Sequence, residues 1–200
     1  MRGAPVLALL MLATAGTARA DPACLLALTH LGARHERLPP QGAGACAVPD
    51  PVRLTSLSAE IDLPGAPVLQ CDSARALALW AAQTLKPAAA MMPGAPRLTR
   101  IDTGPGHVCR DRVGTGEDDP KPSEHATGSA IDIAGFGFAG RDDLPVIPRE
   151  GDMDMAFQRA ARAGACLYFT TVLGPGSNAA HETHLHLDLA RRRGDWRLCE

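Results

Sequence analysis

The sequence predicts an α+β domain in which helices flank a small antiparallel sheet and disulfides staple the fold. Segments with helical periodicity come early in the 200-residue chain, whereas strand-like segments come late. Six cysteines are present without a CxxC pair, and an even number of cysteines in an exported chain is typical of disulfides. Abundant Gly and Pro with only 4% aromatic residues favour a core of small aliphatic side chains and many fixed turns.

Residues 1–20 have the pattern of a secretory signal peptide. Arg2 precedes an apolar run over 6–15, and Ala18-Arg19-Ala20 has the small-x-small form of a cleavage site. The mature chain is therefore expected to be one domain over 21–200. No later apolar run approaches the roughly 20 residues of a membrane span, and Cys24 does not directly follow the cleavage site, so no membrane anchor is expected.

The charge balance excludes binding to nucleic acid through overall charge. The whole chain has 20 basic and 22 acidic residues and a net charge of −2. Removing Arg2 and Arg19 leaves 18 basic against 22 acidic residues, hence −4. Polyanion binders present basic faces.

The cysteines predict three disulfides and an oxidising compartment, either a bacterial periplasm or the extracellular space. The sequence leaves their pairing open. A bridge to the penultimate residue would pin a C-terminus that otherwise frays. The six candidates are Cys24, Cys46, Cys71, Cys109, Cys166 and Cys199.

In the first half of the chain, helix signals dominate. A short helix over 21–31 has Asp21 as its cap and Gly32 as its stop, and the Pro- and Gly-rich stretch 34–51 is expected to be loop. Asp72 can cap a longer helix that Pro87 kinks or divides. Its apolar face repeats at helical spacing through Leu77, Ala81, Leu85 and Ala88 before the helix ends within 91–96.

In the second half, strand signals take over. Residues 97–102 alternate as a short strand, and the acidic stretch 114–122 is expected to be an exposed loop. Asp152 caps a helix to about residue 163, where Gly164 stops it. The remaining expected elements are a strand over 129–138, a buried strand over 167–173, a turn at 174–176 and a last strand over 184–189.

Two short motifs contain the residues suited to metal chemistry. In the last strand His184, His186 and Asp188 share one face, while the leucines between them pack on the other. In the earlier motif His125 stands in a turn, Gly128 lets the backbone reverse, and Asp132 lies on the following strand. One His and one Asp from this segment with one His from the last strand supply two nitrogens and an oxygen, ligands that zinc accepts. The sequence therefore predicts that the sheet carries a site for one zinc ion.

These motifs resemble those of known peptidases. The His125/Gly128/Ala130/Asp132 pattern with a late His-x-His is similar to the signature of zinc metallopeptidases grouped around lysostaphin and the D-alanyl-D-alanine carboxypeptidases. The spacing His181-x-x-His184-x-His186 resembles penicillin-insensitive murein endopeptidases. Over roughly 46–199 the chain is also similar to the bacterial extensin-like C-terminal domain family, in the segments 109–112, 123–126, 170–176 and 184–188.

The peptidase resemblance implies a murein-peptidase-like fold and a role for each matching residue. His125, Asp132 and His186 would be the zinc ligands, and His184 would stand beside the metal as a catalytic residue. The carboxypeptidases have a Glu as general base three residues before the last ligand, where this chain has Thr183. The base therefore remains open between Glu182 and His181.

The segment before the first motif supplies the expected substrate contacts. The resemblance places a substrate-binding arginine upstream of this motif, and Arg110 or Arg112 could hold a peptide carboxylate or a developing oxyanion. A surface ion pair with the acidic loop is the alternative for both arginines. Ser123, which opens the motif, completes the expected substrate-binding set.

The resulting expectation is an exported zinc amidohydrolase or peptidase that acts on D-amino-acid amide bonds in the stem or cross-link peptides of peptidoglycan. A non-catalytic zinc-containing wall-binding module is the first alternative, because the carboxypeptidase Glu is missing. A periplasmic copper or zinc carrier is the second, although a carboxylate ligand suits copper less well. The sequence does not determine the bond cleaved or the oligomeric state.

Overall fold

The fold is an α+β domain built on one large sheet. A computed structural model describes residues 21–113, 118, 121–150 and 153–200; the expected signal peptide and the proposed cap Asp152 lie outside them. The sheet has ten strands, with β1-β2-β3-β5-β6-β9-β8-β10 as its main path, while β4 pairs with β2 and β7 with β6. The α+β class is confirmed, but the sheet is larger than predicted and not purely antiparallel, because β3 pairs with β5, and β8 with β10, in parallel.

Most of the strands are short. The longest is β6 (Ala130–Phe138), which pairs antiparallel with both β5 and β9. The others are β1 (Arg34–Arg37), β2 (Pro51–Ser58), β3 (Ile61–Asp62), β4 (Val68–Gln70), β5 (Leu98–Thr103), β7 (Leu144–Pro145), β8 (Thr171–Leu173), β9 (Leu185–Asp188) and β10 (Leu198–Cys199).

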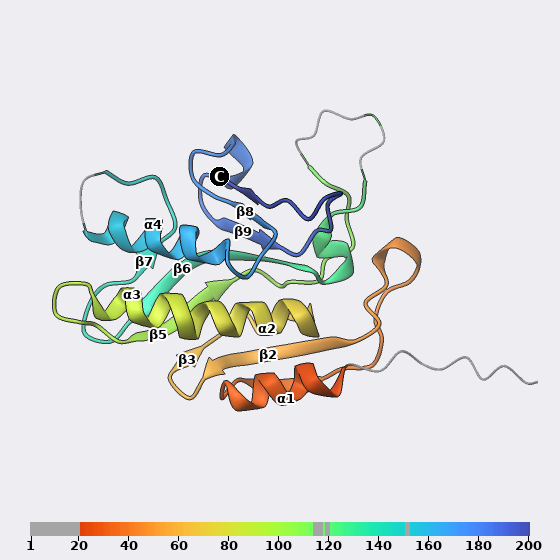
Figure 1. Ribbon diagram of the computed structural model, residues 1–200, viewed down its shortest axis with the longest axis horizontal. Coiled ribbons are helices and arrows are strands. Elements are labelled where there is room, and N and C mark those ends of the chain that lie inside the picture. The colour runs from red at the N-terminus through yellow and green to blue at the C-terminus, as the bar shows by residue number, and fades with distance from the viewer. Residues whose placement is uncertain (1–20, 114–117, 119–120, 151–152) are drawn as a thin grey trace, which may run out of the picture.

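In the described part of the chain, four α-helices accompany the sheet. In Figure 1, α2, α3 and α4 lie in front of the sheet and α1 runs below α2 near β2. The π-helical turn η2 (Ala81–Leu85) joins α2 to α3 and divides the helix just before Pro87, as the proline predicted. The helices are α1 (Pro22–His30), α2 (Cys71–Trp80), α3 (Lys86–Ala90) and α4 (Met153–Ala165).

The structure corrects the sequence prediction between residues 34 and 72. Residues 34–37 form an edge strand rather than a loop. Its side chains are charged or polar, as is common at a sheet edge, so the sequence shows no alternation of apolar residues there. The strands β2, β3 and β4 were not anticipated. Helix α2 starts at Cys71 with Gln70 at the N-cap, so that Asp72 lies within the first turn and pairs with Arg75 instead of capping.

Two further corrections concern the second half of the chain. Helix α4 passes through Gly164 and ends at Ala165. The glycine serves packing instead of stopping the helix, because it lies so close to Thr84 of η2 that a Cβ would overlap the threonine side chain. The strand expected over 167–173 shrinks to Thr171–Leu173, and Leu167 is 72% exposed in the turn before it.

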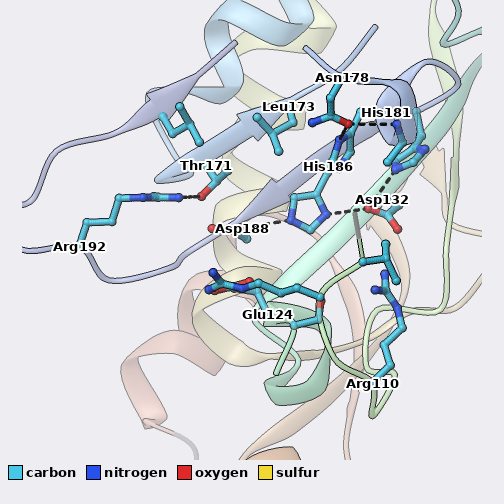
Figure 2. Close-up of a pocket in the computed structure, with 16 residues that line it drawn as sticks. Arg110, Glu124, Asp132, Thr171, Leu173, Asn178, His181, His186, Asp188 and Arg192 are labelled. Carbon is cyan, nitrogen blue, oxygen red and sulfur yellow. Dashed lines mark hydrogen bonds and ion pairs between the residues drawn. The ribbon is translucent and has the colours of Figure 1, made fainter. Parts of the chain in front are cut away.

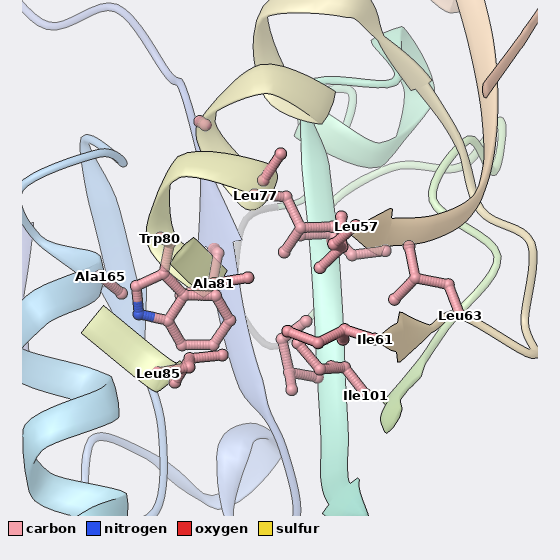
Figure 3. Close-up of a cluster of buried hydrophobic side chains, with 14 of the residues drawn as sticks. Leu57, Ile61, Leu63, Leu77, Trp80, Ala81, Leu85, Ile101 and Ala165 are labelled. Atoms are coloured by element: carbon pink, nitrogen blue, oxygen red, sulfur yellow. The ribbon is translucent and has the colours of Figure 1, made fainter. Parts of the chain in front are cut away.

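The hydrophobic core lies between the helices and the sheet. Trp80 of α2 is fully buried and donates its indole N–H to the carbonyl oxygen of Ala161 in α4 (2.9 Å). Figure 3 places Trp80 near Ala165 of α4, with Leu77 and Leu85 on the same helical run. The indole also meets Phe136 of β6 edge-on. These contacts fix α2 and α4 against β6, the strand that carries the site on its other face.

Three disulfides staple the fold, as predicted. Cys24–Cys71 ties α1 to α2, Cys46–Cys109 ties two loops together, and Cys166–Cys199 fastens the C-terminal segment beside β8. Stable disulfides are typical of proteins in oxidising compartments. Within the described part of the chain, no helix has both the length and the apolar character needed to cross a membrane.

Candidate metal centre

The alternation of side chains on β6 and β9 separates the core from the site. Ile131 and Ile133 of β6 are fully buried in the hydrophobic core, whereas Asp132 between them points to the opposite face. On β9, Leu185 and Leu187 likewise pack inward and His186 turns outward. The strand register sets Asp132 directly across from His186. The two motifs far apart in sequence therefore meet on neighbouring strands.

His125 reaches the same point from the 3₁₀ turn η3 (Glu124–Thr127). Ser123 caps this turn by accepting a hydrogen bond from the His125 backbone N–H (3.3 Å). Gly128 ends the turn at φ +68°, where a side chain would be strained and a Cβ would crowd the Gln70 backbone nitrogen. The cap and the glycine fix the imidazole beneath β6, where His125 is 3% exposed.

The three side chains converge on one point. His125 Nε2 lies 3.3 Å from Asp132 Oδ2 and 3.3 Å from His186 Nδ1, and His186 Nδ1 lies 3.0 Å from Asp132 Oδ1. One donor atom from each residue falls within 4.8 Å of the other two. Four-coordinate zinc with bonds of about 2.0–2.1 Å has neighbouring donors roughly 3.3 Å apart. The two imidazole nitrogens therefore have the separation of two ligands on a zinc tetrahedron, and one oxygen of Asp132 lies close to each of them.

The second nitrogen of each imidazole is also held. His125 Nδ1 lies 2.8 Å from the Gly106 carbonyl oxygen, and His186 Nε2 lies 3.1 Å from Asp188 Oδ2. Both partners accept hydrogen bonds, so each ring in its neutral form carries its proton on the outer nitrogen and turns a lone pair to the shared point. Such outer partners fix the tautomer of histidine ligands in metal sites.

The charges at the site favour a cation. Burial opposes ionisation of Asp132, but hydrogen bonds with His125 and His186 hold its pKa well below the usual range. Burial likewise disfavours a charged His186, yet hydrogen bonds to Asp132 and Asp188 raise its pKa to about 9. In the metal-free site a proton on His186 therefore offsets only one of the two carboxylate charges, and a metal ion could take the place of that proton.

A pocket of about 380 Å³ opens above the donors (Figure 2). His184 precedes β9 and its Nε2 lies 3.7 Å from Asp132 Oδ1. His181 closes the 3₁₀ turn η4 (Ala179–His181) and donates from Nδ1 to Asn178 Oδ1 (2.7 Å), which leaves Nε2 as an acceptor. Burial, followed by the neighbouring His186 and His184, lowers the pKa of His181 to about 4. His181 is consequently neutral at pH 7 and able to accept a proton.

The three residues expected to contact a substrate line this pocket, but they differ in whether protein groups already occupy their hydrogen-bonding atoms. Arg112 is paired with Glu124 of η3 at 2.5 Å, a residue outside the acidic loop 114–122 that the ion-pair alternative named. Ser123 already accepts a hydrogen bond as the cap of η3. Arg110 contacts only the carbonyl oxygen of Asp111, and among the described residues no carboxylate pairs with it. Arg110 is thus the freer of the two arginines.

Glu182 is not brought together with the other site residues. Its Oε1 accepts a hydrogen bond from the Gly176 backbone N–H (3.3 Å), and the residue lines a different depression next to α4. Of the two candidates for a general base, His181 faces the donors and Glu182 does not.

The profile of one protein family, described as extensin-like protein C-terminus, matches residues 22–200. The chain belongs to the extensin-like C-terminal family. Comparison with curated proteins and with solved structures finds no match. The family match supports one of the two resemblances seen in the sequence, and the metallopeptidase likeness of this extensin-like domain rests on its motifs and on the geometry above.

Sequence reasoning did not assign several residues that organise the extensin-like site. Asp188 was placed on the correct face but given no role, and nothing in the sequence marks the Gly106 carbonyl oxygen or Asn178 as partners of histidines. Arg192 also lines the pocket, although the run of three arginines that contains it suggests only a solvated surface. A polar residue two positions after a ligand on the same strand face is a usable signal for Asp188.

Proposed function

We propose that this extensin-like domain is a zinc-dependent amidohydrolase or peptidase that acts on D-amino-acid amide bonds in the stem or cross-link peptides of peptidoglycan. The convergence of His125, Asp132 and His186 at the base of an open pocket is the observation that supports it most. One zinc ion would be held by these three residues. Zinc in such a site polarises a carbonyl and makes water a stronger acid.

The chain's own residues would divide the remaining work. His181 and His184 flank the donors on the pocket side, with their rings 5.2 Å apart. His181 is neutral at pH 7, because its pKa is lowered to about 4, and its Nδ1 is engaged with Asn178; its free Nε2 would accept a proton from water and later release it to the departing amine. His184, with its Nε2 3.7 Å from Asp132 Oδ1, would stand beside the reacting carbonyl. The missing Glu of the carboxypeptidases is then replaced by an imidazole.

Arg110 suits the carboxylate of a substrate. A guanidinium without a carboxylate partner can form a bidentate pair with a peptide carboxylate, and D-amino-acid termini in peptidoglycan carry such a group beside the amide bond. Arg112 would support the wall through Glu124 rather than contact the substrate. The three disulfides are consistent with work in a periplasm or outside the cell.

A non-catalytic zinc-containing wall-binding module is the second candidate. The observation that favours it is the position of Glu182, which hydrogen-bonds Gly176 and leaves the pocket without a glutamate base next to the donors. The two candidates share the metal site and differ in turnover. A copper or zinc carrier fits less well, since the carboxylate of Asp132 occupies the centre of the donor set.

The test combines metal content with turnover. Wild-type protein produced in a periplasm should contain about one zinc per chain by elemental analysis, and His186→Ala and Asp132→Ala should contain none. Asp72→Asn, on an exposed turn of α2, is the matched control. Purified sacculi and defined muropeptides are then digested and the products separated by mass. Zinc binding without any cleavage would favour the wall-binding module, and a wild type without zinc would refute both.

A further inference from the structure

A second feature lies beside the pocket, at the end near the C-terminus, where Arg192 is part of the pocket wall. Trp196 is 53% exposed, and the guanidinium of Arg192 stacks on its ring at 4.9 Å from the centroid. The other tryptophan of the chain, Trp80, is fully buried. An exposed indole with one face covered by a cation leaves its remaining surface available to a ligand.

The fold holds this aromatic ring firmly. Residues 192–195 form a turn closed by a hydrogen bond from the Asp195 N–H to the Arg192 carbonyl oxygen (3.1 Å). The next side chain, Arg197, donates to the carbonyl oxygens of Cys166 and Phe169. Beyond it, β10 pairs with β8 and ends in the Cys166–Cys199 disulfide. The backbone on both sides of Trp196 is therefore held before any ligand arrives, which reduces the entropy cost of binding.

The stack is continuous with the candidate metal centre. Arg192 lines the same pocket as His186 and donates to Thr171 Oγ1 (2.6 Å) and to the Thr170 carbonyl oxygen (3.0 Å). The Thr171 hydroxyl in turn hydrogen-bonds Asp188, the outer partner of His186. In Figure 2 Arg192 and Arg110 lie at opposite ends of the pocket, with Asp132 and His186 between them.

The surroundings of the ring indicate the class of ligand. The exposed neighbours Arg191, Arg193 and Asp195 are charged, so Trp196 is not part of the wide apolar patch that a protein partner or a bilayer requires. A sugar ring has a flat face of C–H bonds that packs on an aromatic face, and its hydroxyl and acetamido oxygens accept hydrogen bonds from a guanidinium. A single indole beside an arginine matches these two requirements.

We propose that Trp196 and Arg192 form a subsite for an N-acetylated sugar of the glycan strand, so that the substrate is peptide still attached to glycan rather than free peptide. This inference rests on the proposed function for its substrate class. The binding of sugar itself requires neither a metal ion nor cleavage, and the two ideas can therefore fail separately.

The experiment measures binding of peptide-free glycan strands of alternating N-acetylglucosamine and N-acetylmuramic acid to the mature protein by calorimetry. Trp196→Ala should weaken binding about tenfold or more, and Trp196→Phe should keep most of it because a ring remains. The control Leu167→Ala removes another exposed apolar side chain and should change nothing. Glycan binding should be the same with and without a metal chelator, because the sugar contacts need no metal ion.

Fluorescence provides a second readout. A bound sugar should alter the emission and iodide quenching of wild-type protein and leave both unchanged in Trp196→Phe, since Trp80 is inaccessible. Weaker binding by Trp196→Ala supports the subsite whether or not the protein cleaves peptides. Absence of glycan binding by wild type, or equal affinity in Trp196→Ala, would overturn it.

Discussion

Replacement of Asp188 tests whether the tautomer of His186 determines metal binding. Asp188 is 3% exposed, and its two carboxylate oxygens have different partners. Oδ1 accepts a hydrogen bond from the Ala190 backbone N–H (2.8 Å), and Oδ2 lies 3.1 Å from His186 Nε2. In Asp188→Asn only one oxygen remains. If that oxygen keeps the backbone bond, the new NH₂ group points at His186 Nε2 and donates to it.

The proton of His186 would then move to Nδ1, the atom that must bind the metal. Metal binding requires the tautomer with the proton on His186 Nε2, and in that tautomer the Nε2–H faces the new amide N–H of Asp188→Asn in a buried position. A buried donor left without an acceptor costs about 1–3 kcal/mol, or roughly 5- to 150-fold in affinity, and loss of an outer partner typically costs about 10–100-fold. We expect Asp188→Asn to lose about 100-fold in zinc affinity. Asp188→Ala places no N–H group against the imidazole and should lose about tenfold.

Competition against a chromophoric zinc chelator at fixed pH measures both values, with circular dichroism to verify the fold of each variant. Asp72→Asn on the exposed first turn of α2 serves as the control for an amide substitution. Zinc affinity of Asp188→Asn within threefold of wild type, or tighter than that of Asp188→Ala, would refute the tautomer argument.

Three further outcomes are expected. His184→Ala and His181→Ala should retain zinc by elemental analysis while losing about 10²–10⁴-fold in turnover; loss of the metal in either would instead make it a ligand. Because zinc must displace the proton of His186, whose pKa is about 9, zinc affinity should rise about tenfold per pH unit from pH 7 and level off above pH 9. Calorimetry in buffers of different ionisation enthalpy should report about one proton released per zinc at pH 7, and a pH-independent affinity would contradict this. Gly164→Ala should reduce the free energy of unfolding by about 1–3 kcal/mol because its Cβ meets Thr84; urea unfolding of the double variant with Thr84→Ala should recover most of that loss.

The candidate site could be predicted from sequence because its geometry is largely local. His125 and Asp132 are seven residues apart around a glycine, and the period of two in a strand sets the face on which His186 lies. Only the pairing of β6 with β9 had to be supplied by the fold. The role of Glu182 could not be decided in this way, since it depends on the path of the loop that brings Gly176 to it.

Other parts of the fold depend on contacts that leave no local signal. The strand Arg34–Arg37 is charged because it lies at the edge of the sheet, and its partner β2 contains buried Ser56 where an apolar residue would be expected. Gly164 has the appearance of a helix stop, but it serves the close approach of two helices. Disulfide pairing likewise joins cysteines 33 to 63 residues apart, and sequence spacing does not determine which ones meet.

The positions of the disulfides imply that the base and the walls of the pocket respond differently to reduction. The donors lie on β6, β9 and η3, which are held together by backbone hydrogen bonds and the apolar core. Two wall segments have covalent links in addition to their backbone hydrogen bonds, because Cys109 is next to Arg110 and Cys199 is next to Leu198, both of which line the pocket. A reducing environment would thus loosen the groups expected to hold a substrate while leaving the metal-binding residues in place. Oxidative folding would then act as a maturation step for substrate capture, separate from the assembly of the metal centre.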